Sequence, residues 1–126
     1  MATQVMKVGI MAREQYIQRT LAIARGKYRP GRDEPSIWFE SLKSLAEVLS
    51  ERNQALLELI QARKPRSLKV LERLTGRSVS NLSRTLKTLE RHGLVELRRE
   101  QKRLVPRVTA THFQVDVEIG PQRLTS

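Results

Sequence analysis

The side chains whose types and spacing suggest chemistry are concentrated in residues 78–92. Val79, Leu82, Leu86 and Leu89 recur at i, i+3, i+7 and i+10, and on an α-helix these positions form one continuous apolar stripe. The other positions are polar or basic, and these side chain types bond to base edges and phosphates in DNA grooves. The segment therefore predicts a helix that is anchored by its leucines and presents a polar face to the major groove.

The polar face divides into two predicted sets of contacts. Arginine pairs well with guanine, asparagine with adenine, and serine or threonine with either kind of partner. Free amide groups and a partial positive charge at the helix N-terminus also favour a phosphate there. The predicted base contacts are Ser78, Ser80, Asn81, Arg84 and Thr85, and the predicted backbone contacts on or beside this helix are Arg77, Lys87, Thr88 and Arg91.

Elements on either side of this helix complete a recognisable pattern. A shorter amphipathic helix is predicted from Ser67 to Leu74, and Gly76 supplies the sharp turn between the two helices. After Gly93 the apolar period changes to two, which predicts a hairpin with a charged turn over residues 98–103. Its basic side chains are further predicted contacts to the DNA backbone or minor groove: Arg98, Arg99, Lys102 and Arg103.

The charge of the chain is concentrated in the same region. The 126 residues contain 24 Lys and Arg against 13 Asp and Glu, a formal net charge of +11. Residues 64–110 alone hold 13 of the basic and four of the acidic side chains. A positive field of this size attracts polyanions, so a nucleic acid is the expected partner.

Catalysis has no support in the sequence. His92 and His112 are isolated, cysteine is absent, and neither a metal-ligand spacing nor a glycine-rich phosphate loop is present. We therefore expect no enzyme activity, no cofactor and no bound metal. Without a membrane-spanning stretch or an export signal, a cytoplasmic protein is expected.

The rest of the chain predicts further elements around this pattern. Residues 11–24 have apolar positions at helical spacing, and residues 25–35 form a basic loop rich in glycine and proline. A short strand is expected at residues 37–39, where Trp38 is a core or dimer anchor, and two short helices follow from Ser41 and Ser50. Residues 113–119 alternate apolar and polar side chains, as in a half-buried strand.

These elements predict a mainly α fold with a small β component, of the α+β class. It is a winged helix-turn-helix domain over residues 36–119, with a recognition helix at 78–92 and a wing at 94–108. An N-terminal helical extension over residues 1–35, a candidate dimerisation arm, precedes it. A C-terminal strand ends the domain, and residues 120–126 form a polar tail.

The run SLKVLERLTGRSVSNLSRTLKTLERHGLVEL resembles the winged helix of MarR-type and ArsR-type regulators. Together with IWFESLKSLAEVLSERNQALLELI, it more narrowly resembles the small TumA-like helix-turn-helix antitoxins, over roughly residues 36–119. This resemblance implies an autorepressor that also neutralises a partner toxin. The chain departs from ArsR-type sensors because it has no cysteine to bind metal.

The sequence thus predicts a homodimeric, sequence-specific regulator that binds a roughly palindromic site in double-stranded DNA. An RNA-binding basic module is an alternative, although none of the five aromatic residues lies in residues 64–110 to stack bases. A protein that only covers a toxin and scarcely binds DNA is the other alternative.

Overall fold

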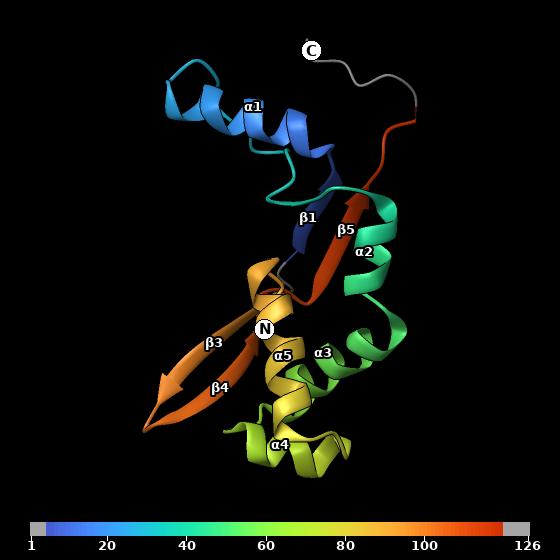
Figure 1. Cartoon of the computed structure of the whole chain (residues 1–126), viewed down its shortest axis with the longest axis vertical. Coiled ribbons are helices and arrows are strands. Elements are labelled where there is room, and N and C mark those ends of the chain that lie inside the picture. The colour runs from blue at the N-terminus through green and yellow to red at the C-terminus, as the bar shows by residue number, and fades with distance from the viewer. Residues whose placement is uncertain (1–4, 120–126) are drawn as a thin grey trace.

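The computed structural model describes residues 5–119, so the tail expected at 120–126 lies outside the described residues. The elements follow in the order β1 (Val5–Ile10), α1 (Arg13–Ala24), β2 (Ile37–Phe39), α2 (Leu42–Val48), α3 (Glu51–Arg63), α4 (Leu68–Thr75), α5 (Val79–Arg91), β3 (Val95–Glu100), β4 (Arg103–Val108) and β5 (His112–Asp116). The fold is α+β, as predicted. The molecule is elongated, with α1 at one end and α4 at the other (Figure 1).

Serine side chains set the starts of the four helices that follow β2. The hydroxyls of Ser41, Ser50, Ser67 and Ser78 each accept the backbone N–H of the residue three positions later, at 3.0 to 3.2 Å. Such caps satisfy donors that a helix N-terminus otherwise leaves unpaired. The helix starts therefore follow directly from the sequence.

The hydrophobic core lies between α3, α4, α5 and the base of the hairpin, and it continues past α2 to the buried side chains of β1 and β2. Leu71, Leu82, Leu86, Leu89 and Leu94 are all fully buried. The leucine stripe predicted for the second helix of the motif is thus confirmed, and it fixes how α5 is rotated about its own axis.

The wing is an antiparallel hairpin of β3 and β4, with Glu100 opposite Arg103. Only Gln101 and Lys102 remain in the turn, and both have positive φ, of 49° and 66°. The charged turn predicted over residues 98–103 is therefore wrong in length, because its outer residues continue the strands. A two-residue turn of this kind matches the twist of the two strands it joins.

A second sheet, with strand order β2-β1-β5 and all strands parallel, joins the two ends of the described chain. The sequence predicts β2 and a strand near β5, but not β1 at its centre. The Trp38 side chain of β2 packs across Gly9 of β1, where an added Cβ would lie 2.6 Å from the indole ring. Gly9 is therefore required for this close approach.

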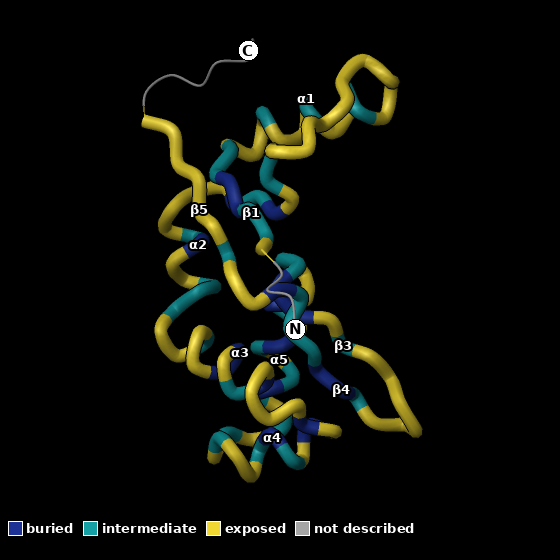
Figure 2. The backbone as a smooth tube through the Cα atoms, turned by 180° about the vertical axis from the view of Figure 1, so that it is seen from behind, coloured by how far each residue is buried: buried dark blue, intermediate teal, exposed yellow. Residues whose placement is uncertain are grey.

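The last strand is shorter and more exposed than predicted. It ends at Asp116, and of the apolar side chains expected to alternate inward, only Phe113 is half-buried. Val115 and Val117 are 43% and 44% exposed, and Ile119 is 97% exposed. The prediction of a half-buried strand over residues 113–119 is therefore wrong, because residues 114–119 are all exposed (Figure 2).

Candidate nucleic-acid interface

The turn between α4 and α5 is fixed by three local features. Gly76 ends α4 in the left-handed conformation, with φ of 76°, and its N–H donates to the carbonyl of Glu72. The Glu72 carboxylate reaches over the turn and accepts the N–H of Val79 at 3.1 Å. Because a side chain of the first helix thus holds the first residue of the second, the angle between them is set before any ligand binds.

The buried leucines of α5 determine which of its side chains face outward. Arg84, Lys87 and Arg91 are exposed, and Ser78 and Ser80 are exposed at its N-terminus. Thr88 is half-buried, and its hydroxyl donates to the carbonyl of Arg84. The structure therefore leaves one polar and basic face of α5 open, beside the wing (Figure 1).

Arg77, Asn81 and Thr85 are joined by their side chains. Arg77 Nε donates to Asn81 Oδ1, and Arg77 Nη2 donates to Thr85 Oγ1, both at 2.8 Å. Burial of the guanidinium, together with the nearby charge of Arg52, lowers the pKa of Arg77. Arg77 was expected to bind the DNA backbone, but in this state it holds two expected base contacts in place.

This arrangement changes what Asn81 offers to a base. One lone pair of its amide oxygen is occupied, while its NH₂ group and the second lone pair are left for a ligand. A bidentate contact to adenine needs one donor and one acceptor, which Asn81 retains. The bond from Arg77 also restricts the rotamers of Asn81, so less conformational entropy is lost on binding.

The cations of the wing differ in their freedom. Arg98 is paired with Glu96 at 2.9 Å, and hydrogen bonding between them lowers the pKa of Glu96 and raises that of Arg98. Arg99, Lys102 and Arg103 are exposed and form no ion pair with any described residue. The tip of the wing therefore offers three free cations, and Arg98 is a fourth whose charge is partly compensated.

Glu90 links the wing to the helix, since its carboxylate accepts the N–H of Leu97 at 3.2 Å. Neither Glu90 nor Glu72 is predicted from the sequence to be a positioning residue. The available signal was their charge: residues 64–110 hold only four acidic side chains, and three of them accept hydrogen bonds that shape this surface. An acidic residue within a basic face can therefore indicate a hydrogen-bond acceptor that positions that face.

A third link runs from the end of α5 to the parallel sheet. His92 stacks on Phe39 of β2, with ring centroids 4.7 Å apart and 15° between the ring planes. Burial of the imidazole, and to a smaller extent the charge of Arg91, lowers the pKa of His92. The His92 side chain therefore connects α5 with β2 and is not part of the exposed basic face.

The described residues contain no group of three or more His, Cys, Asp or Glu side chains placed to hold a metal ion. Within the same residues, no helix combines the length and apolar character needed to cross a membrane.

The order α4, tight turn, α5 and β-hairpin, with α5 held by its leucines, defines a winged helix-turn-helix protein. The chain belongs to the HVO_A0114 family, whose model matches residues 48–115, more than half of its length. One similar solved structure is the "predicted DNA-binding transcriptional regulator from E. coli", at 24% sequence identity and a TM-score of 0.47. The match covers 55% of this chain and 74% of that one. No curated protein matches the chain significantly.

Proposed function

We propose that this protein is a sequence-specific regulator of transcription that binds double-stranded DNA. Residues 78–92 enter the major groove as the recognition helix, and the wing at residues 94–108 lies on the backbone or in the minor groove. The observation that carries the proposal is the rotation of α5. Its leucines are completely buried, so its exposed face is polar and basic, next to the free cations of the wing.

The proposed base contacts are Ser78, Ser80, Asn81, Arg84 and Thr85. Arg84 is the strongest candidate, because it is exposed, lies on the outer face of α5 and forms no ion pair with a described residue. The proposed backbone contacts are Lys87, Thr88, Arg91, Arg98, Arg99, Lys102, Arg103 and, once released from its two partners, Arg77.

The regulator acts as a homodimer in this proposal. A single winged helix buries only about 600–1,000 Å² on DNA, and two copies on half-sites about one helical turn apart are the usual route to tight binding. The operator is accordingly expected to be roughly palindromic. The resemblance to TumA-like antitoxins adds that the protein represses its own promoter and covers a partner toxin.

The experiment is to select binding duplexes from a randomised pool and to measure affinity at several salt concentrations. Arg84→Ala and Asn81→Ala should each cost about 1–3 kcal/mol on the selected site and relax the preference at one base pair. Arg99→Ala should weaken all duplexes to a similar extent and reduce the dependence on salt.

Glu58→Ala is the control variant, since Glu58 lies exposed on α3, outside the proposed interface. Equal losses on selected and random duplexes for Arg84→Ala and Asn81→Ala would contradict direct base readout. If single-stranded RNA displaced the selected duplex at equal concentration, the proposal would give way to an RNA-binding function.

A further inference from the structure

The helix α1 is poorly supported by the rest of the described chain. It is 12 residues long and has no buried residue, and isolated helices of this length are only marginally stable in water. On its outer side Ile17 and Leu21 are 47% and 45% exposed. Figure 2 shows the helix largely in the exposed colour, away from the core. These two side chains make the outer side of α1 a candidate contact surface.

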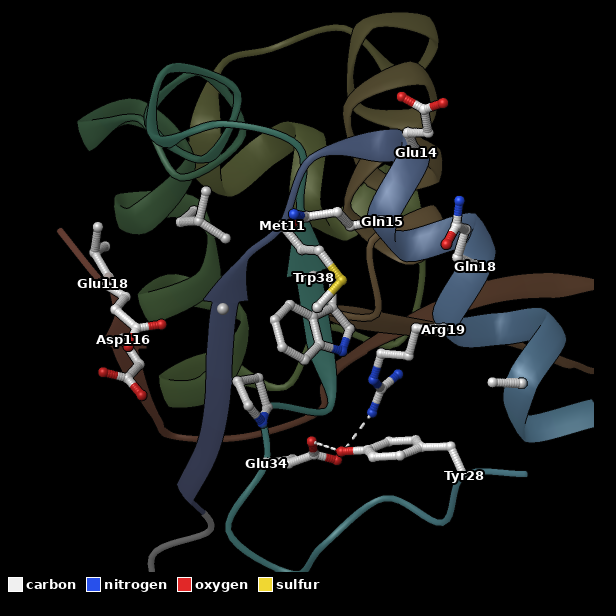
Figure 3. A pocket seen from close by; sticks show the side chains of 15 residues that line it. Met11, Glu14, Gln15, Gln18, Arg19, Tyr28, Glu34, Trp38, Asp116 and Glu118 are labelled. Carbon is white, nitrogen blue, oxygen red and sulfur yellow. Dashed lines mark hydrogen bonds and ion pairs between the residues drawn. The ribbon is translucent and has the colours of Figure 1, made fainter. Parts of the chain in front are cut away.

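The inner side of α1 is fixed to the parallel sheet through Arg19. Its guanidinium lies 5.1 Å from the centre of the Trp38 ring and forms an ion pair with Glu34 at 3.2 Å. Figure 3 shows Arg19 pointing from α1 toward these two side chains, at the edge of a half-open cavity. Gln15 Oε1 and Arg19 Nε are buried here without a hydrogen-bond partner. These contacts determine which face of α1 points outward.

The outward face has a pattern that is complementary to itself. Glu14, Ile17, Leu21 and Arg25 follow one another at i, i+3, i+7 and i+11, which places them on one stripe of the helix and its C-cap residue. Glu14 lies at the border of this stripe, since it also lines the rim of the cavity. An acidic group stands at one end, a basic group at the other, and two apolar groups lie between them. Arg13, next to Glu14 in sequence, points about 100° away around the helix.

Two such stripes match when they run in opposite directions. Consider a two-fold axis that crosses the outward face of α1 at the level of Arg19 along the helix. The acidic end of each stripe then faces the basic end of the other, and the apolar pairs meet at the centre. A C2 interface requires this kind of self-complementary surface. Both Glu14 and Arg25 are exposed and form no ion pair with a described residue, so both are free for a second chain.

We propose that two copies of this chain associate through α1 packed antiparallel, with Ile17 against the partner's Leu21 and Glu14 facing the partner's Arg25. The occupant of the exposed face is thus a second copy, and the charge pattern fixes its orientation. In both whole-chain views α1 lies at the end of the molecule opposite to α4, so this contact leaves the helix-turn-helix uncovered (Figures 1 and 2). The inference gives an interface to the proposed homodimer but does not depend on DNA binding.

The test is the mass of the full chain in solution without DNA, measured by light scattering and sedimentation over a range of concentrations. The wild type should be a dimer. Glu14→Arg and Arg25→Glu should each raise the dimer dissociation constant by at least about tenfold, because each places like charges opposite one another twice. The double variant restores opposite charges at both contacts and should return to the wild-type mass.

Mixing the two single variants provides a sharper test. Each alone repels its own copy, but a pair of one Glu14→Arg chain and one Arg25→Glu chain has complementary charges at both contacts, so a heterodimer should form. Glu51→Arg is the matched control: it also reverses an exposed glutamate in the first turn of a helix, but on α3. It should leave the mass unchanged.

A monomeric wild type would overturn the inference, and so would a dimer that none of the charge reversals affects, because that dimer would use another surface. Ile17→Asp tests the apolar centre of the proposed interface in the same way. It should abolish the dimer and leave the helices of the helix-turn-helix end intact. Binding to the selected duplex, measured separately, shows whether the DNA-binding proposal holds whatever the outcome here.

Discussion

The two ends of this molecule differ in how far their helices are buried. At the helix-turn-helix end, three leucines of α5 are fully buried, and the N-termini of α4 and α5 are capped by serine hydroxyls. At the other end, α1 has no buried residue and Val115 of β5 is 43% exposed. Both ends belong to one short chain with the same solvent around them.

This contrast shows that burial, and not secondary structure, separates a part that is stable by itself from one that is not. A helix gains most of its stability from the apolar face that it packs against other elements. The residues of α5 satisfy this condition within the chain, whereas those of α1 do so only if another surface covers them. We expect the two ends to respond differently to the same type of substitution.

The largest effect should come from removing leucine side chains at the two ends. Leu86→Ala should lower the free energy of unfolding by about 2–5 kcal/mol, because it leaves a cavity in the core beneath α5. Leu21→Ala removes the same atoms from an exposed position on α1. It should cost less than about 1 kcal/mol when measured at a protein concentration that keeps the chain monomeric.

Urea unfolding of the two variants, followed by circular dichroism, checks this prediction. Similar losses of unfolding free energy for both variants would show that α1 is as well packed as α5, and the contrast between the two ends would not hold. A loss that depends on protein concentration for Leu21→Ala alone would show that α1 is stabilised by dimer formation, since mass action links stability to association.

The helix-turn-helix end could be predicted well from the sequence, because its signals are local. Ser67, Gly76 and Ser78 each determine a helix boundary through a bond or a backbone angle within a few residues. The leucine spacing then determines which face is buried. The outline of the candidate DNA surface follows from these features alone.

The other end could not be predicted in the same way, because its structure depends on contacts between distant residues. The strand β1 is central only because β5, more than 100 residues later, pairs with it, as in Val8 with Val115. Nothing local in VMKVGI specifies this partner. Likewise, the apolar alternation of residues 113–119 predicts burial, but whether a face is covered is decided by the tertiary fold.

The bonds of Arg77 to Asn81 and Thr85 also lay beyond sequence reasoning. Their spacing of four and eight residues was visible, but a basic side chain beside a recognition helix is equally suited to a phosphate contact. The choice depends on the side-chain conformation that Arg77 adopts in the folded chain. The sequence places Arg77, Asn81 and Thr85 on or beside α5, but it does not predict the hydrogen bonds among them.

A smaller effect is expected at the wing, where the backbone of one residue is strained. Lys102 has φ of 66°, which is unfavourable for a residue with a Cβ and favourable for glycine. Lys102→Gly should therefore raise the free energy of unfolding by up to about 1 kcal/mol. Arg103→Gly removes the same charge one residue later, in β4, and should destabilise the hairpin. Thermal unfolding of both variants provides the comparison, and a stabilised Arg103→Gly would show that lost charge repulsion, and not backbone strain, is responsible.

The smallest expected effect concerns His92, which joins the two ends by stacking on Phe39. Burial lowers the pKa of His92 in the folded chain, so the unfolded chain, with a histidine pKa of about 6.5, binds the proton more readily. The contribution of His92 to stability is therefore fully present above about pH 6.5 and is lost as the pH falls from there through the lower folded pKa.

His92→Phe keeps an aromatic ring to stack on Phe39 but cannot be protonated. Urea midpoints measured at about pH 7.5 and about pH 5.5, on either side of the histidine pKa in unfolded chains, should differ less for this variant than for the wild type. His112→Phe, a change on the exposed strand β5, is the control and should leave the difference as in the wild type. An unchanged difference in His92→Phe would mean that protonation of His92 does not weaken the contact between α5 and β2.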